Sequence, residues 1–257
     1  MEIILYAVLA GLALALSLTT FGSIIAWKRS SYLSDAIAHS SLLGVTLSYL
    51  YNISANIIII PICFIFSFTL VYLNKKFNVA KDSILLFNTQ LSLALSFIII
   101  SLFIQVPLTS FFFGSILSVS LKDIIIMYVI AVFALIYLYT NWEKIILATI
   151  NTDVAQSENI NTFLQEVILI FVLSSIVSFA IKIAGVLLIP SLMILPNMVA
   201  SGFAKNPLTS LVIAFIVSGV CITLGILTSV FVDVAVAPLI TLYLVGVILV
   251  SLLYYKK

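Results

Sequence analysis

Apolar residues dominate this sequence in long runs that short polar stretches interrupt. Most runs approach about 20 residues, the length that a helix needs to cross the hydrocarbon core of a bilayer. They are too long and too uniformly apolar for the strands of a membrane barrel. We therefore predict an all-α fold, a polytopic transmembrane helical bundle forming one domain over residues 1–257. Its nine expected spans are residues 3–26, 34–51, 54–73, 83–104, 124–140, 164–181, 184–197, 207–230 and 237–254.

Composition supports a membrane protein and excludes several other classes. Hydrophobic residues make up 64% of the chain and charged residues 8%, and the mean hydropathy is +1.36. The net charge of +2 comes without a basic patch, so we expect no nucleic-acid partner. Cys63 and Cys221 lie within apolar runs, where we expect small buried side chains rather than a disulfide or metal thiolates.

The basic residues predict an orientation. Nine of the 11 fall on one side of the predicted topology, and cytoplasmic connections carry the excess of Lys and Arg in membrane proteins. We therefore place the N-terminus outside and the C-terminus inside. The two exceptions are Lys122 and Lys182, and we expect Lys182 to reach interfacial water.

Two connections are longer than tight turns. Residues 105–123 mix aromatic residues with Pro107 and Gly114, and we expect an outer, partly membrane-embedded segment. Residues 141–163 form the longest polar stretch and are expected inside. The chain has no glycine loop of the Walker type, so it does not bind and hydrolyse ATP by that route.

The stretch SDAIAHSSLLG at residues 34–44 holds the only histidine of the chain. Asp35 and His39 are four residues apart, so both lie on one helical face. Counted from Arg29, His39 lies about 15 Å into the membrane, where ionisable residues are costly and commonly functional. Imidazole and carboxylate together suit zinc, manganese or ferrous iron. The alternative is a structural His–Asp pair that ties this helix to a neighbour.

Other polar positions have simpler interpretations. We expect an interhelical hydrogen bond from Gln90 and a helix-cap or turn role for Asp233, with docking of an outer partner as its alternative. Pro190 and Pro196 predict helix breaks. The residues around and after them form either a short helix at the cytoplasmic face, suited to binding a partner, or an ordinary turn.

Four ordered motifs together resemble one family, the membrane permeases of ABC importers for zinc, manganese and iron. The chain is most similar to the high-affinity zinc-uptake permeases. The resemblance covers nearly the whole chain. The motifs are SDAIAHSSLLG at 34–44, FFFGSILSVS at 111–120, AGVLLIPSLMILPNMVASGFAKNP at 184–207 and VFVDVAVAP at 230–238.

The resemblance implies a transport subunit, not an enzyme and without a cofactor of its own, in the bacterial cytoplasmic (inner) membrane. It implies three partners besides lipid: a second permease copy, a cytoplasmic ABC ATPase dimer and an extracytoplasmic metal-binding protein. Asp35 and His39 match the transported-metal site. The segment near residues 197–206 matches the part that docks on the ATPase, where we expect Met198, Val199 and Phe203 to supply apolar contacts.

The sequence departs from the family pattern in three places that bear on function. Gln90 stands where many zinc permeases carry a histidine, and Ser201 with Gly202 replaces a usual basic pair. Ser115 stands in place of a frequent acidic residue, so we expect the outer gate to attract cations less. Zinc is the expected ion, with manganese or iron as the alternative. An ion-coupled secondary transporter is the less favoured alternative. It would need inverted repeats and several interior carboxylates, and the sequence shows neither. An intramembrane metalloenzyme is disfavoured as well, because it would need three ligands in one chain and this chain has a single histidine.

Overall fold

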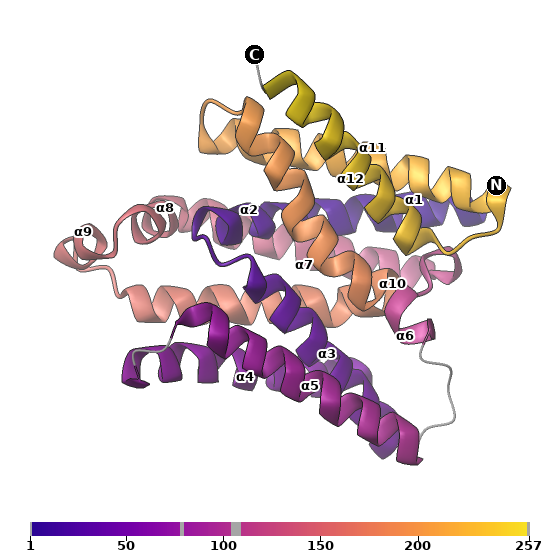
Figure 1. Cartoon of the computed structure of the whole chain (residues 1–257), viewed down its shortest axis with the longest axis horizontal. Helices are drawn as coiled ribbons and strands as arrows, with labels where there is room; N and C mark the ends of the chain where they lie inside the picture. The colour runs from indigo at the N-terminus through magenta and orange to yellow at the C-terminus, as the bar shows by residue number, and fades with distance from the viewer. Residues whose placement is uncertain (1, 78–79, 104–108, 256–257) are drawn as a thin grey trace. The chain divides into compact units, whose positions relative to one another are not determined.

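The computed structural model describes residues 2–77, 80–103 and 109–255, and within these ranges the fold is all-helical without a strand (Figure 1). Residues 105–108 of the predicted outer connection, and Lys256 and Lys257, lie outside the described residues. The elements are α1 (Glu2–Leu14), the π-helix η1 (Ala15–Thr19), α2 (Thr20–Trp27), α3 (Tyr32–Tyr51), α4 (Ala55–Phe77), α5 (Lys81–Phe103), α6 (Thr109–Phe113), the 3-10 helix η2 (Ile116–Ser118), α7 (Leu121–Thr140), α8 (Trp142–Ile150), α9 (Thr152–Ser157), α10 (Thr162–Phe203), α11 (Pro207–Val232) and α12 (Val236–Tyr255).

The number of membrane spans differs from the prediction. Within the described residues, six helical segments are long and apolar enough to cross a membrane: Glu2–Trp27, Asp82–Phe103, Leu121–Thr140, Thr162–Phe203, Pro207–Val232 and Val236–Tyr254. Each predicted span falls mainly on helix within the described residues, but a count of nine is not confirmed. Two predicted spans belong to α10, and α3 carries too many polar residues. In α4 (Ala55–Phe77) the uninterrupted run of fully described residues is Ala55–Phe66, which is shorter than a span.

The chain forms two compact units. Unit 1 comprises residues 1–26, 107–131 and 180–257, and unit 2 comprises residues 27–106 and 132–179. In unit 1, α1 packs against α11, and α11 packs against α12. Gly11 and Gly225 allow close packing there, since an added Cβ would lie 2.4 Å from Ile222 and 2.5 Å from Ile240 respectively. In unit 2, α3 packs against α4 and α5 (Figure 1).

The long helix α10 bends at a glycine rather than at its prolines. Gly185 has φ 71° and ψ 169°, whereas Pro190 and Pro196 lie inside continuous helix. The predicted breaks at the two prolines, and the separate short helix or turn after them, are therefore wrong. Proline is tolerated inside a membrane helix where neighbouring groups satisfy the freed carbonyls. Only glycine adopts the conformation found at residue 185 without strain.

Candidate metal site

The helix α3 presents Asp35 and His39 along its one open side. The residues between and beside them, including Ala36, Ile37 and Ala38, are buried in the packing of the helix. The side chain of His39 is 18% exposed and that of Asp35 43%. The helix ends at Asn52, whose left-handed conformation lets its N–H bond to the carbonyl of Ser48. Local packing thus leaves Asp35 and His39 partly accessible, while the serine and threonine side chains of α3 are buried.

The two side chains are close without forming a well-shaped hydrogen bond. Nε2 of His39 lies 3.4 Å from Oδ1 of Asp35, which exceeds the usual N–H···O range. Two ligand atoms bound at about 2.0–2.1 Å to a tetrahedral zinc ion lie roughly 3.3–3.4 Å apart. The observed separation therefore matches one edge of such a coordination sphere. Nδ1 of His39 is buried and has no hydrogen-bond partner among the described residues.

One chain offers only part of a metal coordination sphere. Within the described ranges, no group of three or more His, Cys, Asp or Glu side chains could hold a metal ion. Cys63 and Cys221 are buried free thiols, as predicted, and Cys63 donates weakly to the carbonyl of Ile37. A tetrahedral ion at Asp35 and His39 would therefore need ligands from water or from a second chain.

Among the described residues, Gln90 forms no interhelical hydrogen bond, contrary to the prediction. It lies on the exposed side of α5, two residues and about 200° around the helix from the buried Ser92. Ser92 faces α3, with 3.4 Å between its Oγ and that of Ser40. This contact sets the register of the two helices, so Gln90 lies at nearly the same level as His39. Small hydroxyl side chains, rather than the amide, make the helix contact.

The three residues expected to dock on an ATPase differ in exposure. Met198 and Phe203 are 54% and 52% exposed, whereas Val199 is only 5% exposed and belongs to the core. The helix α10 ends at Phe203, and a capping box between Asn206 and Thr209 starts α11. The exposed apolar side chains of this segment are therefore Met198 and Phe203, whereas Val199 is buried.

A buried polar clamp beside this segment was not predicted. The Nδ2 of Asn197 donates to the carbonyls of Met193 at 2.7 Å and Thr19 at 3.3 Å, and Ser23 Oγ donates to its Oδ1. Thr19 closes the π-helix η1, a local widening of the kind often found at functional sites. Gly22 lies against the same turn, where an added Cβ would meet the Met193 carbonyl oxygen at 2.0 Å. The clamp joins the first helical segment to α10.

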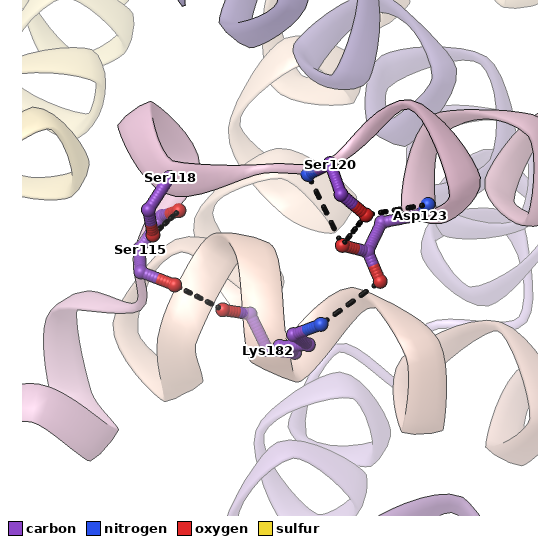
Figure 2. Close-up of polar contacts among 5 residues, drawn as sticks. All are labelled: Ser115, Ser118, Ser120, Asp123 and Lys182. Atoms are coloured by element: carbon purple, nitrogen blue, oxygen red, sulfur yellow. Dashed lines mark hydrogen bonds and ion pairs between the residues drawn. The ribbon is translucent and has the colours of Figure 1, made fainter.

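A second unpredicted polar cluster joins η2, the start of α7 and the bend of α10 (Figure 2). Lys182 is exposed, as expected, and its Nζ lies 2.9 Å from Oδ1 of Asp123. Asp233 has the predicted role of a helix cap, with φ 54° and its N–H bonded to Ser229 O at 2.9 Å. No sequence signal pairs Asp123 with Lys182, which lie 59 residues apart.

Comparison with known proteins assigns the family. The model of the ABC 3 transport family matches residues 1–255. The chain belongs to the ABC 3 transport family. The chain is similar to the high-affinity zinc uptake system membrane protein ZnuB of Buchnera aphidicola subsp. Acyrthosiphon pisum, with 34% identity over 94% of this chain and 93% of that protein. ZnuB of Haemophilus influenzae is 28% identical over 92% of each chain.

The fold agrees with a solved structure. The chain matches PsaBC from Streptococcus pneumoniae in complex with Fab with a TM-score of 0.88, covering 98% of this chain and 91% of that one. Sequence identity is 20%, so this likeness establishes the fold alone. Together with the family assignment, it makes the chain a helical membrane permease of the ABC 3 family, as its motifs indicated.

Proposed function

We propose that this chain is the permease subunit of an ABC importer that moves a divalent transition-metal ion, zinc above all, into the cytoplasm. The observation that carries the proposal is the 3.4 Å separation between His39 Nε2 and Asp35 Oδ1, which suits two ligands of one ion. The names of the ZnuB relatives support zinc. Manganese or iron is the alternative, because a nitrogen and a carboxylate oxygen also serve those ions.

The hydrogen bonding of His39 favours a ligand over a structural link. Among the described residues, it makes no hydrogen bond to another helix, and its only ionic neighbour is Asp35 on the same helix. A histidine that tied α3 to a neighbour would use Nδ1 for that purpose. The described residues also lack the three-ligand cluster that an intramembrane metalloenzyme would need.

Two copies of the chain complete the site in this proposal. Asp35 and His39 from each copy would give four ligands around a two-fold axis, the number usual for zinc. Gln90 supports this arrangement, because it is exposed at nearly the same level as His39. Facing lipid in mid-membrane, its amide would have no hydrogen-bond partner. A second copy of the chain would cover this surface. A site whose ligands come from both copies would also permit release of the ion, because a movement that separates the copies divides the ligands between them.

The remaining partners follow from the family and from exposed residues. We propose that Met198 and Phe203 bind a cytoplasmic ABC ATPase dimer, which hydrolyses the ATP, so that this chain itself is not an enzyme. An extracytoplasmic metal-binding protein delivers the ion to the outer face. Both units act as one permease domain in the bacterial cytoplasmic (inner) membrane.

The N-terminus faces outward and the C-terminus inward in this proposal. Reporter fusions after Asn78 and Asn159 should then report the cytoplasm, and fusions after Thr109 the outer side. Opposite signals at all three positions would reverse the proposed orientation.

The function is tested by metal uptake. The chain would be expressed with its ATPase and binding protein in a bacterial strain that lacks its own zinc importer. We expect zinc uptake and growth at low zinc to be restored, and manganese and iron uptake to stay low. Restoration of manganese or iron uptake alone would reassign the ion, and no uptake of any of the three metals would reject the proposal.

A further inference from the structure

The bend of α10 frees a main-chain acceptor. In a continuous helix the carbonyl of Lys182 accepts a hydrogen bond from the N–H of Val186, four residues later. Gly185 lies between them with φ 71° and ψ 169°, so that bond is interrupted. A carbonyl freed in this way is costly near the membrane unless another donor reaches it.

Ser115 supplies the missing donors from the outer segment, which we define as residues 114–120. Its N–H donates to the carbonyl of Lys182 at 3.3 Å. Its Oγ donates to the same carbonyl at 3.2 Å (Figure 2). Ser115, which lies 67 positions from Lys182 in the sequence, thus donates two hydrogen bonds to the same carbonyl. The bend of α10 and the position of the outer segment depend on each other.

Two glycines make this approach possible. Gly114 and Gly185 both have positive φ, 65° and 71°, a conformation in which glycine is strongly favoured. A Cβ on Gly114 would lie 2.5 Å from the Gly185 nitrogen, and a Cβ on Gly185 would lie 2.4 Å from the carbonyl oxygen of Phe112. The two backbones therefore touch directly, and a larger residue at either position would separate them.

An ion pair makes a second, weaker connection. Ser120 and Asp123 cap the start of α7: Ser120 Oγ donates to Asp123 Oδ2 at 2.6 Å, and the Asp123 N–H donates to Ser120 Oγ at 3.3 Å. This cap directs the other carboxylate oxygen of Asp123 at Lys182 Nζ. Because Lys182 is exposed, the pair adds little stability and can open readily.

The outer segment also has space on a side away from α10. A cavity of about 330 Å³ is lined by Phe113–Ser118, by Ser229 of α11, and by Val234–Val236, where the turn leads into α12. None of its lining residues comes from α10. The segment therefore lies between a set of breakable bonds and a space into which it could move.

We propose that the Lys182 carbonyl is a two-position acceptor, with Ser115 and Asp123 as positioning residues for transport. In the arrangement seen here, Ser115 holds the carbonyl and α10 is bent. In the second arrangement α10 straightens at Gly185, the Val186 N–H takes the carbonyl, and the outer segment moves toward the cavity. Each arrangement satisfies the carbonyl, so the two can interconvert as discrete states.

The exchange would connect the two ends of unit 1. The part of α10 that follows Gly185 ends at Met198 and Phe203, the residues assigned above to ATPase binding, and this functional link rests on that proposed function. A movement imposed at Phe203 would change the bend and thereby release or recapture the outer segment. Ser115 would thus be coupled to Phe203 through the bend at Gly185 and the helical residues that follow it.

Thiol labelling of the purified full-length permease tests the exchange without transport. Ile116 is buried in the outer segment, and the native cysteines are buried too, so Ile116→Cys reports release of the segment to a maleimide. Gly185→Ala disfavours the bend, and we expect it to raise the labelling rate about fivefold or more. Lys182→Gln removes only the ion pair and should give a smaller rise.

The matched control is Gly246→Ala in Ile116→Cys, because Gly246 is helical and has no atom within 4 Å of an added Cβ. Its labelling rate should equal that of Ile116→Cys alone. Equal rates for Gly185→Ala and Gly246→Ala, in monodisperse protein, would overturn the proposal. If Gly185→Ala does not fold, Ser115→Ala replaces it, and an unchanged rate there would likewise overturn it. Failure of metal uptake in every variant and in the parent would reject the import function but leave the labelling result standing.

Discussion

On α3, Nε2 of His39 lies 3.4 Å from Oδ1 of Asp35, one helical turn away, while the second ring nitrogen of His39 is buried without a partner. The imidazole is therefore held close to a carboxylate without being bound to another helix within the described residues. This geometry leaves both groups available to an ion. It also allows a direct spectroscopic prediction.

Zinc bound to the purified permease should show nitrogen and oxygen ligands in X-ray absorption. We expect at least one imidazole nitrogen at about 2.0–2.1 Å. The multiple-scattering signal of imidazole should vanish in His39→Ala and persist in Ser48→Ala, a matched change on the same helix. Sulfur scattering at about 2.3 Å would instead indicate thiolate ligands and would contradict the assignment.

Exposed apolar residues at the end of α10 should stabilise the complex with the ATPase. Full burial of one such side chain is worth roughly 1.5–3 kcal/mol, so Phe203→Ala should lower the affinity for the ATPase measurably. Leu253→Ala removes another exposed apolar side chain, near the end of α12, and should leave the affinity unchanged. Equal affinities for Phe203→Ala and the parent would show that this segment is not the contact.

The Asn197 clamp should contribute to stability rather than to docking. Asn197→Ala leaves the Thr19 carbonyl without the Asn197 amide and Ser23 without its side-chain acceptor, which should destabilise the fold by about 1–3 kcal/mol. The free energy of unfolding in detergent would measure this loss. The neighbouring Ser201→Ala is exposed and bonds only within its own turn, so it should change stability little. A neutral Asn197→Ala would mean that the clamp carries no net energy.

Close packing at Gly22 can be tested with a pair of alanine substitutions. In Gly22→Ala the new Cβ would collide with the Met193 backbone, so we expect poor folding and low yield in membranes. Gly246→Ala has open space around it and should be neutral or stabilise its helix by up to about 1 kcal/mol. Normal yield and thermal stability of Gly22→Ala would show that the contact between α2 and α10 is looser than described.

Much of the fold could be predicted from the sequence, because membrane helices are recognisable as long runs of hydrophobic residues. The predicted span 207–230 corresponds to α11 at Pro207–Val232, and Asp233 caps it as expected. The predicted boundary between the spans 164–181 and 184–197 lies next to the bend of α10 at Gly185, whereas the breaks expected at Pro190 and Pro196 are wrong. The decisive contact at Gly185 comes from Gly114, far away in sequence.

The functional surfaces were only partly predictable for a similar reason. A helix that is apolar all round gives no pattern that distinguishes its core face from its open face. The sequence therefore placed Val199 with Met198 and Phe203, although Val199 is buried. The Asp123–Lys182 pair depends on tertiary packing and has no local signature. The Asp35–His39 pair was visible because one helical turn separates its members.

The central claim is that Asp35 and His39 carry the ion during ATP-driven import. The most direct test measures radioactive zinc accumulation in proteoliposomes that contain the permease and its ATPase, supplied with the binding protein. We predict ATP-dependent accumulation with the parent chain, and none with the Asp35→Asn/His39→Ala double variant, although the variant still assembles with the ATPase. Accumulation by the assembled double variant at the parent rate would contradict the account.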